Sequence, residues 1–163
     1  MEDLANKDEY LTGKKIVVAL SGGIDSVVLL HFLNKHYPGN VRAVHINHNL
    51  SKHSDEWCSF CERICNSAKI EFKYISINIQ NSSNIEENAR KKRYLSLKSE
   101  LRVGEILCTA HHQEDQAETF LLQLFRGSGV AGLASMPKIK SIGDSELYRP
   151  FLNISKPFCN LYS

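Results

Sequence analysis

Short apolar runs alternate with longer helical patterns along almost the whole of this chain. The runs that predict strands lie at 15–20, 41–46, 70–77, 105–110 and 147–152. The helical patterns are expected at 26–36, from about 55, at 85–101 and at 114–125. Strands separated by helices of this length form right-handed crossovers, which place the strands parallel to one another. The sequence therefore predicts an α/β, doubly wound fold, with a mainly parallel five-stranded sheet and helices on both faces.

Length and composition limit the classes of protein to consider. The 163 residues are enough for one domain with a buried core, and we expect one domain over 1–163. A formal charge of +2 does not by itself indicate a nucleic-acid binder. The N-terminus lacks the pattern of a signal peptide, and no apolar run reaches the ~20 residues of a membrane span. Five cysteines without a secretion signal are typical of reduced thiols, so a cytoplasmic protein is expected.

The segment SGGIDS lies directly between the first predicted strand and its helix. In an open α/β sheet, ligands bind at the carboxyl ends of the strands. Two glycines allow the backbone N–H groups to approach an anion, and serine hydroxyls and the helix N-terminus attract it further. The pattern matches neither the Walker loop nor the dinucleotide fingerprint. The residues expected to hold phosphate are Ser21, Gly22, Gly23, Ile24, Asp25 and Ser26.

Asp25 is the unusual member of this loop, because a carboxylate repels phosphate oxygens. A divalent cation between them removes the conflict, and Mg²⁺ prefers such oxygen ligands. We therefore expect Asp25 to bind a metal ion. A plain strand-to-helix turn with Asp25 as N-cap explains the same residues equally well from local chemistry alone.

Five segments of the chain resemble a known family. SGGIDS resembles the PP-loop of the N-type ATP pyrophosphatases, enzymes that activate a substrate by adenylation. Within that group, four further segments resemble tRNA(Ile)-lysidine synthases in the right order: HINHNL at 45–50, IEENARKKRY at 85–94, TAHHQEDQAETFLLQLFRGSGVAGLASM at 109–136 and YRPFL at 148–152. The resemblance covers roughly 15–155. It implies a Rossmann-like, adenine nucleotide alpha hydrolase-like fold that uses ATP and Mg²⁺.

The resemblance also implies roles for the four histidines and the acidic residues near the phosphate loop. The loop with His45 and His48 is expected to frame the adenosine, and His111 and His112 are expected to face the phosphates and the metal. These loops flank the phosphate loop if the strand order is 3-2-1-4-5. Each histidine also has an ordinary explanation as a hydrogen-bonded strand-end residue, and four together raise the alternative of zinc. Asp115 is expected to be a catalytic metal ligand, whereas Glu114 replaces the family's usual aspartate and its role is open.

Two further motifs of the resemblance carry arginines. Glu86, Arg90 and Arg93 share one stripe of a helix and are expected to hold the substrate, either a carboxylate or an RNA phosphate. A surface Glu–Arg pair is the alternative. Arg126 is expected to neutralise charge at the α-phosphate, or else to interact with the carbonyl end of its helix. Gly127 is expected to end that helix in left-handed geometry.

The cysteines supply a test of a rival function. Cys58, Cys61 and Cys65 suggest an iron–sulfur or redox site, as in PP-loop enzymes that thiolate tRNA. However, Cys61 and Cys65 lie on one apolar stripe with Trp57 and Ile64, which is typical of buried cysteines that act as small hydrophobic residues.

The reaction that the resemblance implies has two steps. ATP adenylates the C2 oxygen of the wobble cytidine in tRNA(Ile) and pyrophosphate leaves; the ε-amino group of free lysine then attacks C2 and expels AMP. The expected partners are tRNA(Ile) and lysine, without a membrane and with a homodimer as one compatible assembly. Family members continue well beyond the length of this chain, so we expect it to bind ATP but to modify tRNA poorly alone. The alternatives are another PP-loop enzyme, such as a thiolase, and a nucleotide-binding module without activity.

Overall fold

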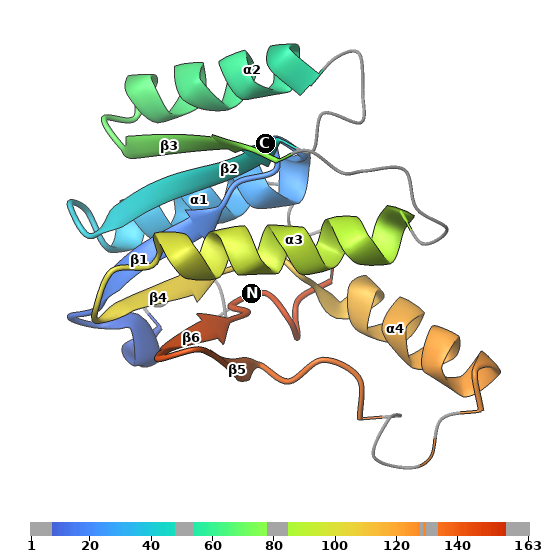
Figure 1. Ribbon diagram of the computed structural model, residues 1–163. Helices are drawn as coiled ribbons and strands as arrows, with labels where there is room; N and C mark the ends of the chain where they lie inside the picture. The colour runs from blue at the N-terminus through green and yellow to red at the C-terminus, as the bar shows by residue number, and fades with distance from the viewer. Residues whose placement is uncertain (1–7, 48–53, 78–84, 128, 130–133, 156–163) are drawn as a thin grey trace.

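The computed structural model describes residues 8–47, 54–77, 85–127, 129 and 134–155. These residues form one six-stranded sheet in the order β3-β2-β1-β4-β6-β5 (Figure 1). The strands are β1 (Lys15–Ala19), β2 (Val41–Asn47), β3 (Glu71–Ser76), β4 (Glu105–Cys108), β5 (Ile139–Ile142) and β6 (Ser145–Tyr148). All neighbouring pairs are parallel except β5 and β6. The expected parallel order of five strands is confirmed, and β5 is an additional antiparallel edge strand.

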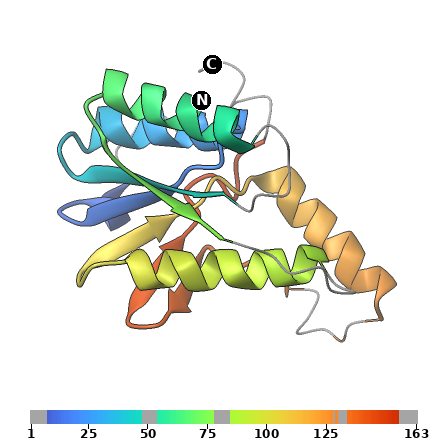
Figure 2. The ribbon, with the colours of Figure 1, turned by 45° about the horizontal axis from the view of Figure 1, so that its top comes forward.

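Helices cover both faces of the sheet, as expected. Helices α1 (Ile24–His36) and α2 (Ser54–Ser67) pack on one face, and α3 (Ile85–Glu100) crosses the other (Figure 2). Helix α4 (Gln113–Phe125) follows the carboxyl end of β4 and extends away from the sheet (Figure 1). It has no buried side chain among its residues. No helix in the described part of the chain is long and apolar enough to cross a membrane.

The β-branched strands supply two apolar cores, one on each face of the sheet. Side chains of successive strand residues point to opposite faces. Val18 of β1 therefore packs with Leu29 and Cys61 beneath α1 and α2. Val17 and Leu107 pack instead with Leu97 of α3. The crossovers thus bury both faces of the central strands, which fixes their carboxyl ends as the open edge.

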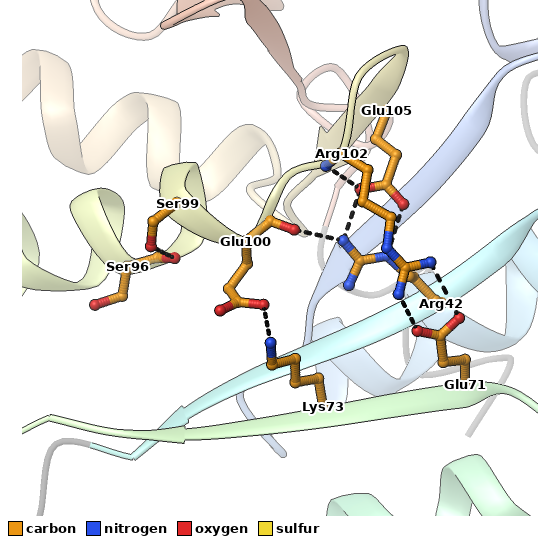
Figure 3. A network of polar contacts seen from close by, with 8 residues as sticks. All are labelled: Arg42, Glu71, Lys73, Ser96, Ser99, Glu100, Arg102 and Glu105. Atoms are coloured by element: carbon orange, nitrogen blue, oxygen red, sulfur yellow. Dashed lines mark hydrogen bonds and ion pairs between the residues drawn. The ribbon is translucent and has the colours of Figure 1, made fainter.

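A charged network ties the amino ends of the strands together (Figure 3). Arg42 of β2 makes a buried bidentate ion pair with Glu105 of β4, with Nε 2.7 Å and Nη2 2.6 Å from the carboxylate oxygens. Arg102 pairs with Glu71 at the start of β3, and Lys73 pairs with Glu100 at the end of α3. The network lies at the edge of the sheet opposite the carboxyl ends, where functional loops are expected.

Candidate functional site

The loop between β1 and α1 is held in shape by its own two serines. The Ser26 hydroxyl donates to the Gly23 carbonyl at 2.8 Å and accepts from the Ser21 N–H at 3.2 Å. The Ser21 hydroxyl lies 3.0 Å from that of Ser26 and accepts from the Gly23 N–H at 3.2 Å. Both serines line a cavity, but Ser26 is buried whereas Ser21 is exposed.

Gly22 lets the loop turn close to α2. Its φ of +89° is rare for residues with a side chain. A Cβ atom at this position would lie 2.9 Å from Cε3 of Trp57 and 3.3 Å from Sγ of Cys61. Trp57 was expected on the buried stripe of α2, but 48% of it is exposed and its ring lies against the loop. The loop and the tryptophan are therefore in direct contact.

A cavity of about 300 Å³ opens beside this loop at the carboxyl ends of β1, β2 and β4. Helix α3 closes its other side. The residues that line it are Ala19, Leu20, Ser21, Gly23, Asp25, Ser26, Val44, Ile46, Arg93, Tyr94, Leu97, Thr109, Ala110 and His111. The position of β1 between β2 and β4 brings these loops together, as the strand order required. Apolar strand ends on one side and polar loop groups on the other suit a ligand with a flat apolar part and an anionic part.

His112 lies between the two carboxylates that were predicted to bind metal. Its ring is buried, with Nε2 3.6 Å from Oδ2 of Asp25. Its Nδ1 is 3.4 Å from Asp115 and 3.0 Å from Glu114. Asp115 also accepts from the His112 backbone N–H at 2.8 Å, which closes the first turn of α4. Of these acidic residues, Asp25 lines the cavity.

Two further histidines that were predicted as site residues, the half-buried His111 and the buried His45, have different surroundings. His111 lines the cavity with Nδ1 2.9 Å from the Thr109 hydroxyl. Burial, and then the positive charge of Arg149, lowers the pKa of His111 to about 4, so its imidazole is neutral near pH 7. His45 donates from Nδ1 to the Leu20 carbonyl at 2.8 Å, and burial lowers its pKa as well. His45 thus holds the backbone at Leu20, directly after β1. His48 lies outside the described residues.

The predicted arginines are divided between two cavities. Arg93 lines the 300 Å³ cavity, whereas Arg90 and Arg126 line a second cavity of about 650 Å³ between α3, the end of α4 and the β5–β6 hairpin. Tyr94 lines both, with the guanidinium carbons of Arg90 and Arg93 5.9 and 5.8 Å from its ring centre. The side chain of Glu86 lies outside the described residues.

The walls also contain residues that were not predicted as site residues, among them Tyr94, Thr109 and Arg149, which stand in the quoted motifs. Tyr94 follows the arginine stripe, Thr109 ends the motif's strand, and Arg149 follows the last parallel strand. A position at the carboxyl end of a strand was the available signal for Thr109 and Arg149. Gly127, with φ of +66°, ends α4 as predicted.

The cysteines of α2 behave as core residues. Cys61 and Cys65 are buried and belong to the apolar core beneath α1 and α2. Burial raises the pKa of Cys61 to about 12 and that of Cys65 to about 11. Thiols with such raised pKa values are poor nucleophiles and poor metal ligands. This agrees with the structural interpretation of the cysteines rather than the redox one.

Comparisons with known proteins agree with this geometry. The chain is 44% identical over 154 residues to a tRNA(Ile)-lysidine synthase of Actinobacillus pleuropneumoniae, and 48% identical over 149 residues to that of Photorhabdus laumondii. These alignments cover 94% and 88% of this chain, but it spans about a third of the relatives' length (36% and 34%).

Solved structures show the same fold at low identity. A U34-tRNA thiolase of Methanococcus maripaludis matches with a TM-score of 0.71 at 21% identity, over 91% of this chain and 56% of that one. An NMN synthetase of Francisella tularensis matches with a TM-score of 0.61 at 16% identity, over 92% of this chain and 60% of that one. The model of one family, described as the PP-loop domain, matches residues 1–162. The chain therefore belongs to the PP-loop domain family.

Proposed function

We propose that the chain is the ATP-binding part of a ligase that joins lysine to C2 of the wobble cytidine in tRNA(Ile). The observation that carries the proposal is the phosphate loop at the mouth of the 300 Å³ cavity, with Ser21, Asp25 and His111 around it. Membership of the PP-loop family implies the use of ATP. The specific substrates rest on the similarity to tRNA(Ile)-lysidine synthases.

ATP is assigned to the cavity by its two kinds of wall. The apolar ends of β1 and β2, with Leu20, Val44 and Ile46, suit the adenine ring. The loop backbone and the N-terminus of α1 suit phosphate oxygens. Arg93 adds a cation from the α3 side. The three features line one cavity.

Mg²⁺ fits this site at Asp25. Asp25 is the carboxylate on the cavity wall, and Mg²⁺ is commonly held by one or two carboxylates together with substrate phosphates. When bound, the ion would neutralise charge on the phosphates. Asp115 as a second ligand stays a prediction, because the His112 ring stands between it and Asp25.

The side chains supply position and charge rather than a covalent nucleophile. The Ser21 hydroxyl and the loop N–H groups orient the phosphates for attack by the cytidine oxygen. His111 is neutral, so it can donate one hydrogen bond without adding a charge. Arg93 lies where negative charge develops as pyrophosphate leaves. Lysine then attacks C2 through its amine, and AMP departs from the same cavity.

Calorimetric titration of ATP in the presence and absence of Mg²⁺ tests the nucleotide site. Ser21→Ala should weaken binding under both conditions. Asp25→Asn should weaken binding only with Mg²⁺ and leave it equal or tighter without, because the variant removes a metal ligand and a repulsive charge together. Ser67→Ala, at the far end of α2, is the matched control. Equal affinity for all four proteins in both titrations rules out the phosphate loop as the ATP site.

The ligase reaction itself is tested with radiolabelled lysine, ATP and a tRNA(Ile) transcript. Label in the RNA together with pyrophosphate release is the expected signature. Sulfur transfer to the RNA in place of lysine transfer would instead identify a thiolase.

A further inference from the structure

The second cavity, of about 650 Å³, has a strongly one-sided charge. Five cationic side chains line it: Arg90, Lys91, Arg126, Lys140 and Arg149. They come from α3, from the end of α4 and from the β5–β6 side of the sheet. Among the described residues of this wall, Glu87 is the one carboxylate, and its Oε1 is 2.8 Å from the ammonium group of Lys91. The described part of the wall therefore carries five cations against one carboxylate.

Arg149 is the most constrained of these cations. It is 3% exposed, and its Nη1 donates to the Pro137 carbonyl at 2.6 Å. Its Nε is buried and has no hydrogen-bond partner among the described residues. Burial lowers the pKa of Arg149; the neighbouring Tyr94 side chain acts in the opposite direction, and the positive charge of Arg90 lowers the pKa further. A buried guanidinium that is beside another cation and incompletely hydrogen-bonded is stabilised by an anion.

Most of the uncharged residues on the wall are apolar or aromatic. Tyr94, Leu95, Ile142 and Leu147 line the cavity beside the cations, and 65% of Leu95 is exposed. The guanidinium of Arg90 lies 5.9 Å from the centre of the Tyr94 ring. Aromatic rings next to arginines are the surfaces on which unpaired bases of single-stranded nucleic acids stack.

We propose that this second cavity binds a nucleotide of single-stranded RNA, with its phosphate on the arginines and Lys140 and its base against Tyr94 and Leu95. Free lysine does not suit the cavity, because its net positive charge would face five cations and one carboxylate on the described part of the wall. The choice of RNA rests on the proposed function, whereas the anionic character of the ligand follows from the side chains alone. Since Tyr94 also lines the ATP cavity, a nucleotide bound here shares one side chain with that cavity.

Fluorescence anisotropy with a short fluorescein-labelled single-stranded RNA tests this assignment in the 163-residue chain. Lys140→Ala and Arg126→Ala should each weaken binding about fivefold at 0.1 M salt and lower the salt slope by about 0.7, the value for one phosphate contact in a single strand. Lys35→Ala, at an exposed position of α1 on the other face of the sheet, is the control and should change neither quantity. Lys140→Ala should bind ATP like the native chain.

The outcomes separate the cavity from the proposed function. The assignment is overturned if the native chain does not bind RNA. It is also overturned if the three variants have the same RNA affinity and the same salt slope as the native chain. Displacement of RNA by pyrophosphate at matched ionic strength, with a pyrophosphate affinity that Lys140→Ala lowers, also overturns it in favour of a free-phosphate site. A native chain that does not bind ATP, but binds RNA more tightly than Lys140→Ala does, would refute the proposed function and leave the cavity assignment standing.

Discussion

Gly22 joins the phosphate loop to α2 through a position that has no room for a side chain. Alanine there would hold an unfavourable φ of +89° and place its Cβ 2.9 Å from the Trp57 ring. Gly13→Ala is the matched control, because Gly13 has φ of +75° and open space around its Cβ position. Both variants should lose ~1–2 kcal/mol of stability from the backbone. Gly22→Ala should lose roughly 1–3 kcal/mol more from overpacking, together with ATP affinity. Urea unfolding and calorimetry measure both effects, and equal losses in the two variants would contradict the close contact.

His111 makes stability depend on pH in a direction that its environment determines. Burial and Arg149 lower its folded pKa to about 4, from an unfolded value of ~6.5. The unfolded chain therefore binds more protons between these values, and the stability contributed by neutral His111 is complete above pH ~6.5 and is lost as pH falls toward 4. The loss near pH 5 should be roughly 2 kcal/mol. Urea unfolding above pH ~6.5 and near pH 5 should show a smaller loss of stability in His111→Gln than in the native chain. The control His31→Gln should show the same loss as the native chain. An unchanged pH dependence in His111→Gln would contradict the lowered pKa.

At the scale of elements, the Arg42–Glu105 pair joins β2 to β4 through a buried contact between the amino ends of the strands (Figure 3). Both side chains are 6% exposed. Burial alone would raise the pKa of Glu105, but hydrogen bonds from Arg42 and the Arg102 N–H, with their charges, lower it overall. Arg42→Met leaves a buried carboxylate unpaired and should cost about 3–5 kcal/mol.

The double variant Arg42→Met with Glu105→Met should recover much of that loss, because no uncompensated charge remains. Urea unfolding gives the coupling energy. The native pair stabilises above the unfolded pKa of Glu105 and less as pH falls through its lowered folded value. Additive losses in the double variant would show that the two side chains do not interact.

The elements also show what a sequence pattern can and cannot predict. The parallel strands and their helices follow from apolar periodicity, because each is buried against a neighbour. Strand β5 was missed, since Ile139–Ile142 is mostly exposed and lacks an apolar run. Gly143-Asp144 between it and β6 was the available hairpin signal. The strand predicted at 147–152 ends at Tyr148, because Pro150 cannot donate to a ladder.

The candidate site also contains features that the sequence could predict and features that it could not. The phosphate loop and His111 were predictable, because they directly follow strands whose carboxyl ends meet. The separation of Arg90 from Arg93 was not, since both satisfy one helical stripe and the two cavities lie on either side of Tyr94. The role of Arg149 depends on its burial between α3 and the hairpin, which no local pattern reports.

At the scale of the whole molecule, α3 stands between two cavities that the proposals assign to ATP and to RNA. Tyr94 lines both and shares the wall of the second cavity with Arg149, while each cavity has its own arginine, Arg93 or Arg90. The two ligands therefore use different cations but share one ring. We predict that ATP and RNA bind with positive coupling, because a ring that one ligand holds in place costs the other ligand less to order.

This coupling is a measurable free energy, and it is reciprocal. ATP should raise the affinity for the labelled RNA at least about fivefold, and RNA should raise the affinity for ATP by the same factor. Tyr94→Ala should bring that factor toward one. Leu95→Ala, which changes the RNA cavity alone, should weaken RNA binding and keep the factor. Anisotropy titrations with and without ATP measure the factor in one direction and calorimetry in the other. A coupling factor of one in the native chain would mean that the two cavities bind their ligands independently. A factor that is unchanged in Tyr94→Ala would mean that Tyr94 does not carry the coupling.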